Sequence, residues 1–412
     1  MHPITRAHRS GFSLLEMVVV LGIISLLALM VILTLNPVQL IEQSRDARRV
    51  SDLATIDAAV TLYQSDQGLM PGYSIGTTTM NYISVPAANT NCSDLGLATS
   101  AYPYTCSGVT NFKTVAGAGW IPINFQSIRG GSPFNSLAGD PVNQTSSNLY
   151  YTYNTDGSRY VVTAFMESNK YANQVRSSGG ADPTLYEVGS GLSNLPISGR
   201  GLAGYWPLNE GSGLSAVDWS GYNSTGTWSG TTPYYASGYN QSYAGNFDGS
   251  DAIVSIPNTS QFQFGTGNFS VGAWVKTSAS LSEAAAVAAN RCGIAESWAL
   301  ETYNNKASFS TFGTGSAGYL TSPGTINDGN WHYLVGVRNG TSVTIYLDGV
   351  PVNSASVSAG YNSNSGASVI TIGNLSAGGS CNHYWNGNIQ DVRIYDRALS
   401  GSEVQQIYNI EK

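Results

Sequence analysis

Residues 17–35 are the feature that most restricts how this chain can fold. They form a run of nineteen residues without a charged side chain, rich in Val and Ile at its start and in Leu toward its end. A helix rises about 1.5 Å per residue, so this run would span roughly the ~30 Å hydrocarbon core of a bilayer. No helix breaker occurs before Asn36-Pro37. The sequence therefore predicts a helix that lies in a membrane or in an equally apolar assembly.

A carboxylate stands at the beginning of this helix. Glu16 directly precedes the uncharged run, where burying a charge costs free energy unless a partner compensates for it. A secretory signal peptide would have a shorter apolar run and a small-residue cleavage site, which residues 36–38 do not provide. A plain single-pass anchor accounts for the run but leaves Glu16 unexplained. The carboxylate favours a third interpretation, in which a partner compensates for its charge.

The sequence G-F-S-L-L-E at residues 11–16, followed by the apolar run, resembles the N-terminal signature of type IV prepilins. The resemblance implies that residues 1–11 are a leader, which a prepilin peptidase removes by cutting between Gly11 and Phe12. Phe12 would then be N-methylated, and residues 12–35 would be a transmembrane segment and later the filament core. Glu16 would meet the N-terminal amine of a neighbouring pilin subunit, in a homo- or hetero-filament.

Arginines on both sides of the apolar run leave its orientation open when positive charges alone are counted. Arg6 and Arg9 precede the run, and Arg45, Arg48 and Arg49 follow it. By the pilin resemblance, the leader stays in the cytoplasm and the remainder lies outside. The chain would reside in the inner (cytoplasmic) membrane before assembly and at the cell surface, in an extracellular pilus, afterwards.

The helix is expected to continue to residue 68. Leu53, Ile56, Val60 and Tyr63 recur at a spacing of three or four residues, which places them on one apolar stripe. Pro37 predicts a kink, and Gly68 with Pro71-Gly72 predicts the end of the helix. Residues 12–68 would be the pilin N-terminal helix, whose second half packs against a globular head.

Residues 69–188 carry strand and turn patterns that fit a small β-rich head. The run Tyr150 to Phe165 has Asp-Gly between two β-branched and aromatic segments, which predicts a hairpin. Residues 120–125 contain a proline in a short apolar segment, which predicts an edge strand or a loop. Residues 189–201 are rich in Gly and Ser and predict a linker.

The chain has four cysteines, and an even number in an exported chain favours two disulfides. Three connectivities are open. We prefer Cys92–Cys106 and Cys292–Cys381, because each pair then stays within one predicted domain. Free buried thiols are the alternative. A zinc site is disfavoured, because the sequence has no C-x-x-C and only four histidines.

Residues 202–412 break into short alternating strands, such as 269–276 and 331–338, which predict a sandwich or jelly roll. Ser400-Gly-Ser-Glu403 predicts a helix cap near the end. Successive blocks along this region resemble the concanavalin-A-like, laminin-G-like lectin/glucanase superfamily: G-Y-W-P-L-N-E-G-S-G (204–213), F-D-G (247–249), N-W-H-Y (330–333) and D-V-R-I-Y-D-R-A-L-S (391–400). The whole chain is thus predicted to be α+β: a long N-terminal transmembrane/pilin helix with a small β-rich head, then an all-β jelly-roll sandwich.

The superfamily resemblance implies carbohydrate or glycoprotein binding, often with a structural calcium ion. Asp218, Asn223 and Asp391 match positions where the family often holds calcium. The alternative is that Asp218 forms an Asx-turn and Asp391 pairs with Arg393 or a backbone donor.

Four aromatic residues in loop-like settings are candidates for stacking on sugar rings: Trp298, Tyr319, Tyr384 and Trp385. The alternative is that they belong to the core or rim of the sandwich. Catalytic residues are not expected, because no two acids alternate along a strand as a glycosidase pair would. The net charge of −7, without a basic aromatic-interleaved cluster, disfavours nucleic acid as a partner.

Three functions remain open from the sequence. The first is a pilin-like filament subunit that presents a lectin-like domain for surface adhesion. The second is a structural or secretion-type pseudopilin with a non-binding sandwich cap. The third is a membrane-anchored extracellular glycan hydrolase. We favour the first, a non-enzymatic adhesive subunit.

Overall fold

The structure is a computed structural model. It describes residues 14–412 except residues 36, 69–79, 96, 98–103, 156–158, 172–173, 176–177, 179–184, 191–200, 240–242, 282, 291–296, 365, 367–368 and 376–382, and it does not describe the side chains of residues 27–35, 80, 169 and 410.

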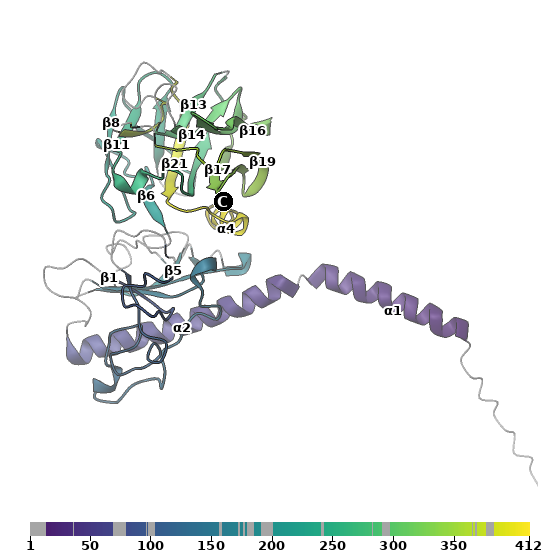
Figure 1. Cartoon of the computed structure of the whole chain (residues 1–412), viewed down its shortest axis with the longest axis vertical. Helices are drawn as coiled ribbons and strands as arrows, with labels where there is room; N and C mark the ends of the chain where they lie inside the picture. The colour runs from purple at the N-terminus through teal and green to yellow at the C-terminus, as the bar shows by residue number, and fades with distance from the viewer. Residues whose placement is uncertain are drawn as a thin grey trace, which may run out of the picture.

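Two consecutive helices, α1 (Leu14–Leu35) and α2 (Pro37–Gln67), begin the described chain. Pro37 is the first residue of α2, a position where the missing N–H of proline has no intrahelical acceptor to lose. Figure 1 shows α1 projecting away from the rest of the molecule. The predicted interruption at Pro37 is confirmed, and so is the helix end, because Gly68 follows α2 in a left-handed conformation with φ 88°.

The buried side of α2 packs on the head. Leu53, Ile56, Val60 and Tyr63 are all buried in the core of the head, so the predicted stripe is confirmed. The sheet of the head contains, in spatial order, β2 (Tyr104–Thr105), β1 (Met80–Ile83), β3 (Thr152–Thr155), β4 (Tyr160–Phe165) and β5 (Leu185–Val188). Only the β1–β2 pair is parallel among these strands, and β3 pairs with β4 as the predicted hairpin.

The segment between β2 and β3 is mostly irregular, with short helices η1 (Phe125–Ser127) and η2 (Thr145–Ser147). The predicted proline-containing segment at 120–125 is a loop up to Phe125, where η1 begins, which confirms one of its two alternatives. A disulfide joins Cys92 to Cys106, whose Cα atoms are 5.4 Å apart, so this predicted pairing is confirmed. Cys292 and Cys381 lie outside the described residues. A third short helix, η3 (Asn169–Tyr171), follows β4.

From Leu202 onward the chain forms two packed eight-stranded sheets. The first contains β19 (Val350–Ser356), β18 (Ser342–Leu347), β17 (Trp331–Asn339), β12 (Phe269–Lys276), β21 (Asn386–Tyr395), β10 (Ala244–Asp248) and β9 (Tyr235–Ala236) in spatial order, with β6 (Leu202–Trp206) also paired to β21. The second contains β16 (Gly318–Thr325), β15 (Lys306–Phe312), β14 (Ser297–Tyr303), β13 (Ala285–Ala289), β20 (Val369–Ile372), β11 (Ile253–Pro257), β8 (Gly226–Ser229) and β7 (Ser215–Ala216). The turn η4 (Ser260–Phe262) follows β11. The predicted sandwich is confirmed.

Alternation along β12 divides its side chains between two environments. Phe269, Val271, Ala273 and Val275 belong to the core between the sheets, as the sequence predicted. Trp274, on the opposite side of the strand, belongs to a second cluster formed with the C-terminal helix α4 (Gly401–Glu411). The sandwich therefore has one sheet face covered by α4.

The helix α4 begins with the predicted capping box. The Ser400 side chain accepts a hydrogen bond from the backbone N–H of Glu403, and the Glu403 carboxylate accepts one from the backbone N–H of Ser400. The helix runs for 11 residues, longer than the one or two turns that the sequence suggested, because its Val404 and Ile407 are buried against the sheet. Figure 1 shows α4 at the side of the sandwich that faces the head.

Candidate functional site

The N-terminal helix is the first candidate site, because its apolar side chains lie uncovered. Leu14 is 84% exposed, Leu21 61% and Leu26 64%. Glu16 lies in the first turn of α1 and is also exposed. Gly11 and Phe12, the predicted processing site, lie outside the described residues. An apolar helix exposed in this way needs a further molecule or a lipid phase to cover it.

Within the part of the chain that the structure describes, no helix combines the length and apolar character needed to cross a membrane. The transmembrane role expected for residues 12–35 stays a prediction.

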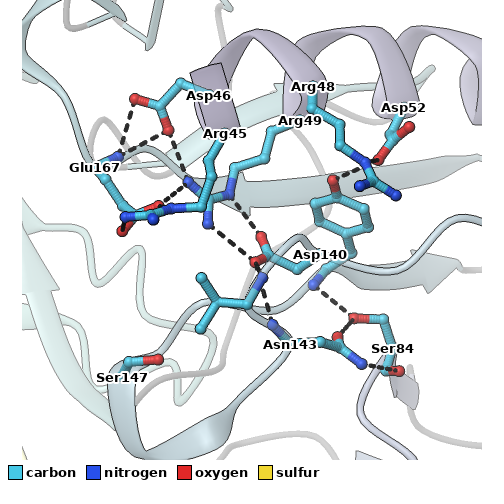
Figure 2. A network of polar contacts seen from close by, with 12 residues as sticks. Arg45, Asp46, Arg48, Arg49, Asp52, Ser84, Asp140, Asn143, Ser147 and Glu167 are labelled. Atoms are coloured by element: carbon cyan, nitrogen blue, oxygen red, sulfur yellow. Dashed lines mark hydrogen bonds and ion pairs between the residues drawn. The ribbon is translucent and has the colours of Figure 1, made fainter. Parts of the chain in front are cut away.

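A buried ion network attaches α2 to the head, and Figure 2 shows it from close by. Arg49 on α2 donates two hydrogen bonds to Asp140, with Nε–Oδ2 2.6 Å and Nη2–Oδ1 2.9 Å. Its Nη1 also donates to Asp46 at 2.8 Å and to Glu167 at 2.6 Å. Arg45 binds both carboxylate oxygens of Glu167, each at 2.6 Å. Arg49, Asp46 and Asp140 are almost completely buried, so the charges are satisfied inside the protein.

The carboxylate of Asp46 also ties the helix to the segment after β4. It accepts hydrogen bonds from the backbone N–H groups of Glu167 and Ser168 and from the Ser168 hydroxyl, at 2.6–3.2 Å. Burial alone would lower the pKa of Arg49, but the hydrogen bonds and charges of Asp140 and Glu167 outweigh it and raise that pKa. Arg49 is therefore charged at any physiological pH.

Sequence reasoning missed this network. It counted Arg45, Arg48 and Arg49 only as positive charges that follow the apolar run. The acidic partners Asp140 and Glu167 lie 91 and 118 residues further along the chain from Arg49, so no local pattern connects them.

Two predicted ligand-binding residues are corrected by the structure. Trp298 and Trp385 are 0% exposed and belong to the core between the two sheets. Trp298 contacts Phe269 with ring centroids 5.7 Å apart. Neither ring can stack on a sugar from solvent in this conformation, because the sandwich uses both to fill its interior.

The other two predicted ligand-binding residues do reach the surface. Tyr319 on the edge strand β16 is 38% exposed and stacks on Tyr303, with ring centroids 4.0 Å apart and an interplanar angle of 17°. Tyr384 is half-buried and forms an isolated bridge with Asn374. The four predicted aromatic residues are thus split between core and surface, and their binding role stays a prediction for Tyr319 and Tyr384.

Two of the three predicted calcium ligands, Asp218 and Asp391, are engaged in other contacts. Asp218 accepts hydrogen bonds from the backbone N–H groups of Tyr205, Ser220 and Ser224 at 2.8–3.0 Å, which uses both of its carboxylate oxygens. This is an Asx-turn arrangement, the alternative that the sequence left open. Asn223 lies in the same turn with φ 57°.

Asp391 accepts a hydrogen bond from the Tyr205 hydroxyl at 2.8 Å and lies 3.7 Å from Arg393. Among the residues that the structure describes, no group of three or more His, Cys, Asp or Glu side chains is arranged to hold a metal ion. Calcium binding by Asp218, Asn223 and Asp391 stays a prediction.

A second buried ion pair fastens the C-terminal helix. Arg393 Nη1 and Glu411 Oε1 are 2.5 Å apart, and Trp274 Nε1 donates to the other oxygen of Glu411 at 2.8 Å. The Arg393 guanidinium lies over the Tyr205 ring, 4.3 Å from its centroid. Burial raises the pKa of Glu411 to about 7, although Arg393 acts to lower it. The contacts of Glu411 with Arg393 and Trp274 hold α4 against the sheet.

Of the isolated acidic residues of the sandwich, Glu301 lies fully buried in β14 and the Glu283 side chain is 82% exposed. Glu296 lies outside the described residues. The expectation that the chain has no catalytic carboxylate pair stays a prediction.

The similarity of the chain to two solved structures is weak. The binding domain of Paraclostridial Mosquitocidal Protein 1 is 16% identical with a TM-score of 0.41, and the alignment covers 50% of this chain and 52% of that one. Domain 4 of AbnA, a GH43 extracellular arabinanase from Geobacillus stearothermophilus, is 19% identical with a TM-score of 0.40, covering 52% and 98%. The chain thus spans about half the length of the first structure. At these TM-scores, neither similarity bears on function.

No curated protein matches the chain. Two family models match separate parts of it. One, the prokaryotic N-terminal methylation motif, matches residues 6–32, and the other, the concanavalin A-like lectin/glucanases superfamily, matches residues 248–405. The exposed apolar α1 and the two-sheet sandwich agree with these matches. The chain therefore combines a prokaryotic N-terminal methylation motif at residues 6–32 with a concanavalin A-like lectin/glucanase domain at residues 248–405.

Proposed function

We propose that the chain is a type IV pilin-like filament subunit that presents a carbohydrate- or glycoprotein-binding sandwich for surface adhesion, and that it is not an enzyme. One observation carries this proposal. A methylation motif leads into an uncovered apolar helix, and a lectin-like sandwich lies elsewhere in the same molecule, clear of that helix (Figure 1). The first part suits assembly, and the second suits recognition.

The assembly part uses Gly11, Phe12 and Glu16. A prepilin peptidase removes residues 1–11, and the freed amine of Phe12 is methylated. In the filament, Glu16 of one subunit meets that amine of a neighbour. Opposite charges attract far more strongly in an apolar surrounding than in water, and removing one would leave the other buried and unpaired. The subunit resides in the inner membrane before it is assembled into a filament at the cell surface.

The recognition part is supported by the superfamily of the sandwich. Many copies along one filament would present many weak sites, and avidity then raises the overall affinity by roughly 10²–10⁴. The ion network around Arg49 supports this arrangement, because it joins the head firmly to α2, the helix that comes after the filament helix α1 in the chain.

Filament assembly is tested with Glu16→Ala, compared with the parent and with Glu42→Ala as a control outside the apolar run. Sheared surface fractions are measured for the subunit, and its N-terminus is sequenced. We expect Phe12 as the first residue in the parent and the Glu42 variant, and loss of the Glu16 variant from the surface. An intact leader on surface protein, or normal filaments of the Glu16 variant, would overturn the assembly part.

Recognition is tested with the full chain in a detergent that has no sugar headgroup. The protein is applied to an array of glycans, and binding to a defined subset is expected. If filaments form but no glycan binds, the pseudopilin alternative replaces the adhesive one. If bound glycans are cleaved, and the cleavage is lost on replacing a particular pair of carboxylates, the hydrolase alternative replaces it.

A further inference from the structure

A cavity of about 760 Å³ lies between the head and the sandwich. Its lining comes from both parts: Ser146 and Asn148 from the head, and Asn339, Ser402 and Gln406 from the sandwich. Ligand sites in proteins commonly have volumes of roughly 300–1,000 Å³ and occur preferentially between domains. The size and position of this head–sandwich cleft therefore fit a ligand site.

One carboxylate fixes the geometry of the cleft wall. Glu403 receives a hydrogen bond from Asn148 Nδ2 across the junction at 2.9 Å. Arg397 binds both oxygens of the same carboxylate, with Nη2–Oε1 2.8 Å and Nη1–Oε2 3.1 Å. Burial alone would raise the pKa of Glu403, but Arg397 and the hydrogen bonds from Ser400 and Asn148 outweigh it and lower that pKa. The two parts thus meet through a preorganised polar contact, which holds the lining residues in place.

The lining offers hydrogen-bond donors and acceptors in close proximity. Hydroxyl and primary amide groups, as on Ser402 and Asn339, can each act in both roles. Gln406 is only 5% exposed, and its side-chain Nε2 has no acceptor among the residues that the structure describes. Buried amides are nearly always hydrogen-bonded, so this one calls for a further acceptor. A molecule with many hydroxyl groups would supply such acceptors.

The charges at the cleft disfavour an anionic ligand. Glu42, Glu167 and Asp396 line it together with Glu403, whereas Arg397 is the one cation among the described residues of the lining. Arg397 is already bound to Glu403, and the nearby Arg45 to Glu167. Burial and the charge of Glu167 raise the pKa of Glu42, as expected where carboxylates gather. An acidic sugar would add repulsion without gaining a free cation.

We propose that the head–sandwich cleft binds a neutral oligosaccharide, held by side chains of both the head and the sandwich. This inference rests on the proposed recognition function and gives it a location that neither the superfamily match nor the sequence indicated. The ligand would contact the pilin head directly, so the head would take part in recognition as well as carrying the sandwich.

The test uses the full chain in a detergent without a sugar headgroup, with immobilised neutral oligosaccharides and their sialylated counterparts as probes. Ser146→Trp and Ser402→Trp place a large ring in the cleft from its two walls, and both serines are exposed, so the folds should tolerate the change. Ser354→Trp, at an exposed position on β19 that does not line the cleft, is the matched control. Asn339→Ala is measured alongside, because it removes one amide without adding bulk.

We expect both cleft tryptophans to lower the affinity for the neutral probes at least tenfold, Asn339→Ala to lower it about three- to tenfold, and Ser354→Trp to leave it unchanged. The sialylated probes should bind more weakly than the neutral ones. Thermal melting confirms that each variant is folded. Unchanged binding in all three cleft variants would overturn the cleft site and leave the recognition function standing. Failure of the parent to bind any glycan would overturn both.

Discussion

Arg49 and Asp140 form a two-pronged ion pair between the helix α2 and the head, with both side chains completely removed from solvent. Breaking such a pair leaves an uncompensated buried charge, which typically costs about 3–5 kcal/mol. We therefore expect Arg49→Gln to lower the free energy of unfolding of the head by about that amount. Denaturant unfolding of the full chain in detergent, followed by far-UV circular dichroism, measures it.

Arg48→Gln is the matched control for this exchange. Arg48 is 63% exposed and lies 3.6 Å from Asp52, as a surface ion pair worth about 0–1 kcal/mol. Equal effects of the two exchanges would mean that the network around Arg49 does not hold the head on the helix.

His332 gives the sandwich a stability that depends on pH. Its Nδ1 lies 2.9 Å from Asp348 and its Nε2 3.3 Å from Asp328. The hydrogen bond with Asp348 raises the pKa of His332 despite partial burial. The folded state thus favours the protonated ring. The stabilisation is fully present below the unfolded pKa of about 6.5 and is lost as the pH rises through the higher folded pKa.

Melting temperatures of the parent and His332→Gln across pH 5 to 9 test this expectation. The difference between the two should be largest at the acidic end and should shrink toward alkaline pH. Using the difference removes the contribution of Glu411, whose pKa is raised by burial. A difference that is constant across this range would contradict the role of the two carboxylates.

Trp298 and Tyr319 should respond very differently to truncation. Trp298→Ala opens a cavity in the core and should lower stability by about 3–5 kcal/mol. Tyr319→Ala removes one half of an exposed ring stack, worth about 0.5–1.5 kcal/mol. Chemical unfolding of both variants distinguishes them. The structure places Trp298 in the core. Similar losses of stability in the two variants would contradict that placement.

Replacing Asp218 distinguishes its role in an Asx-turn from a role as a calcium ligand. If its carboxylate serves the three backbone N–H groups, Asp218→Ala should lower stability by about 2 kcal/mol or more, because hydrogen bonds to a charged group are involved. The loss should be the same in EDTA and in millimolar calcium. A loss that appears only with calcium, together with calcium-dependent stabilisation of the parent, would instead identify a metal ligand.

The sequence predicted those parts of the fold that local patterns determine. The stripe through Leu53 and Tyr63 follows from helical spacing, and the capping box from Ser400 and Glu403 three residues apart. The alternating sides of β12 follow from the period of a strand. Each of these patterns is formed by residues that are close together in the sequence. No distant partner therefore had to be known.

The parts that the sequence did not predict depend on distant partners. Arg49 gives no sign of its burial, because Asp140 reaches it only when the head folds onto α2. The sequence placed Trp298 in a loop-like setting, yet it lies in the strand β14, and its ring packs on Phe269 of the opposite sheet. The cleft beside Glu403 requires the head and the sandwich to meet, and no single segment contains both of its walls.

The contact between Asn148 and Glu403 also has a consequence for how the molecule comes apart. The same carboxylate that receives Asn148 closes the first turn of α4. Fraying of that turn and separation of the head from the sandwich would accordingly be one event. Heating should then melt the joint and the start of the helix together, so the two halves would lose their mutual orientation in a single cooperative step.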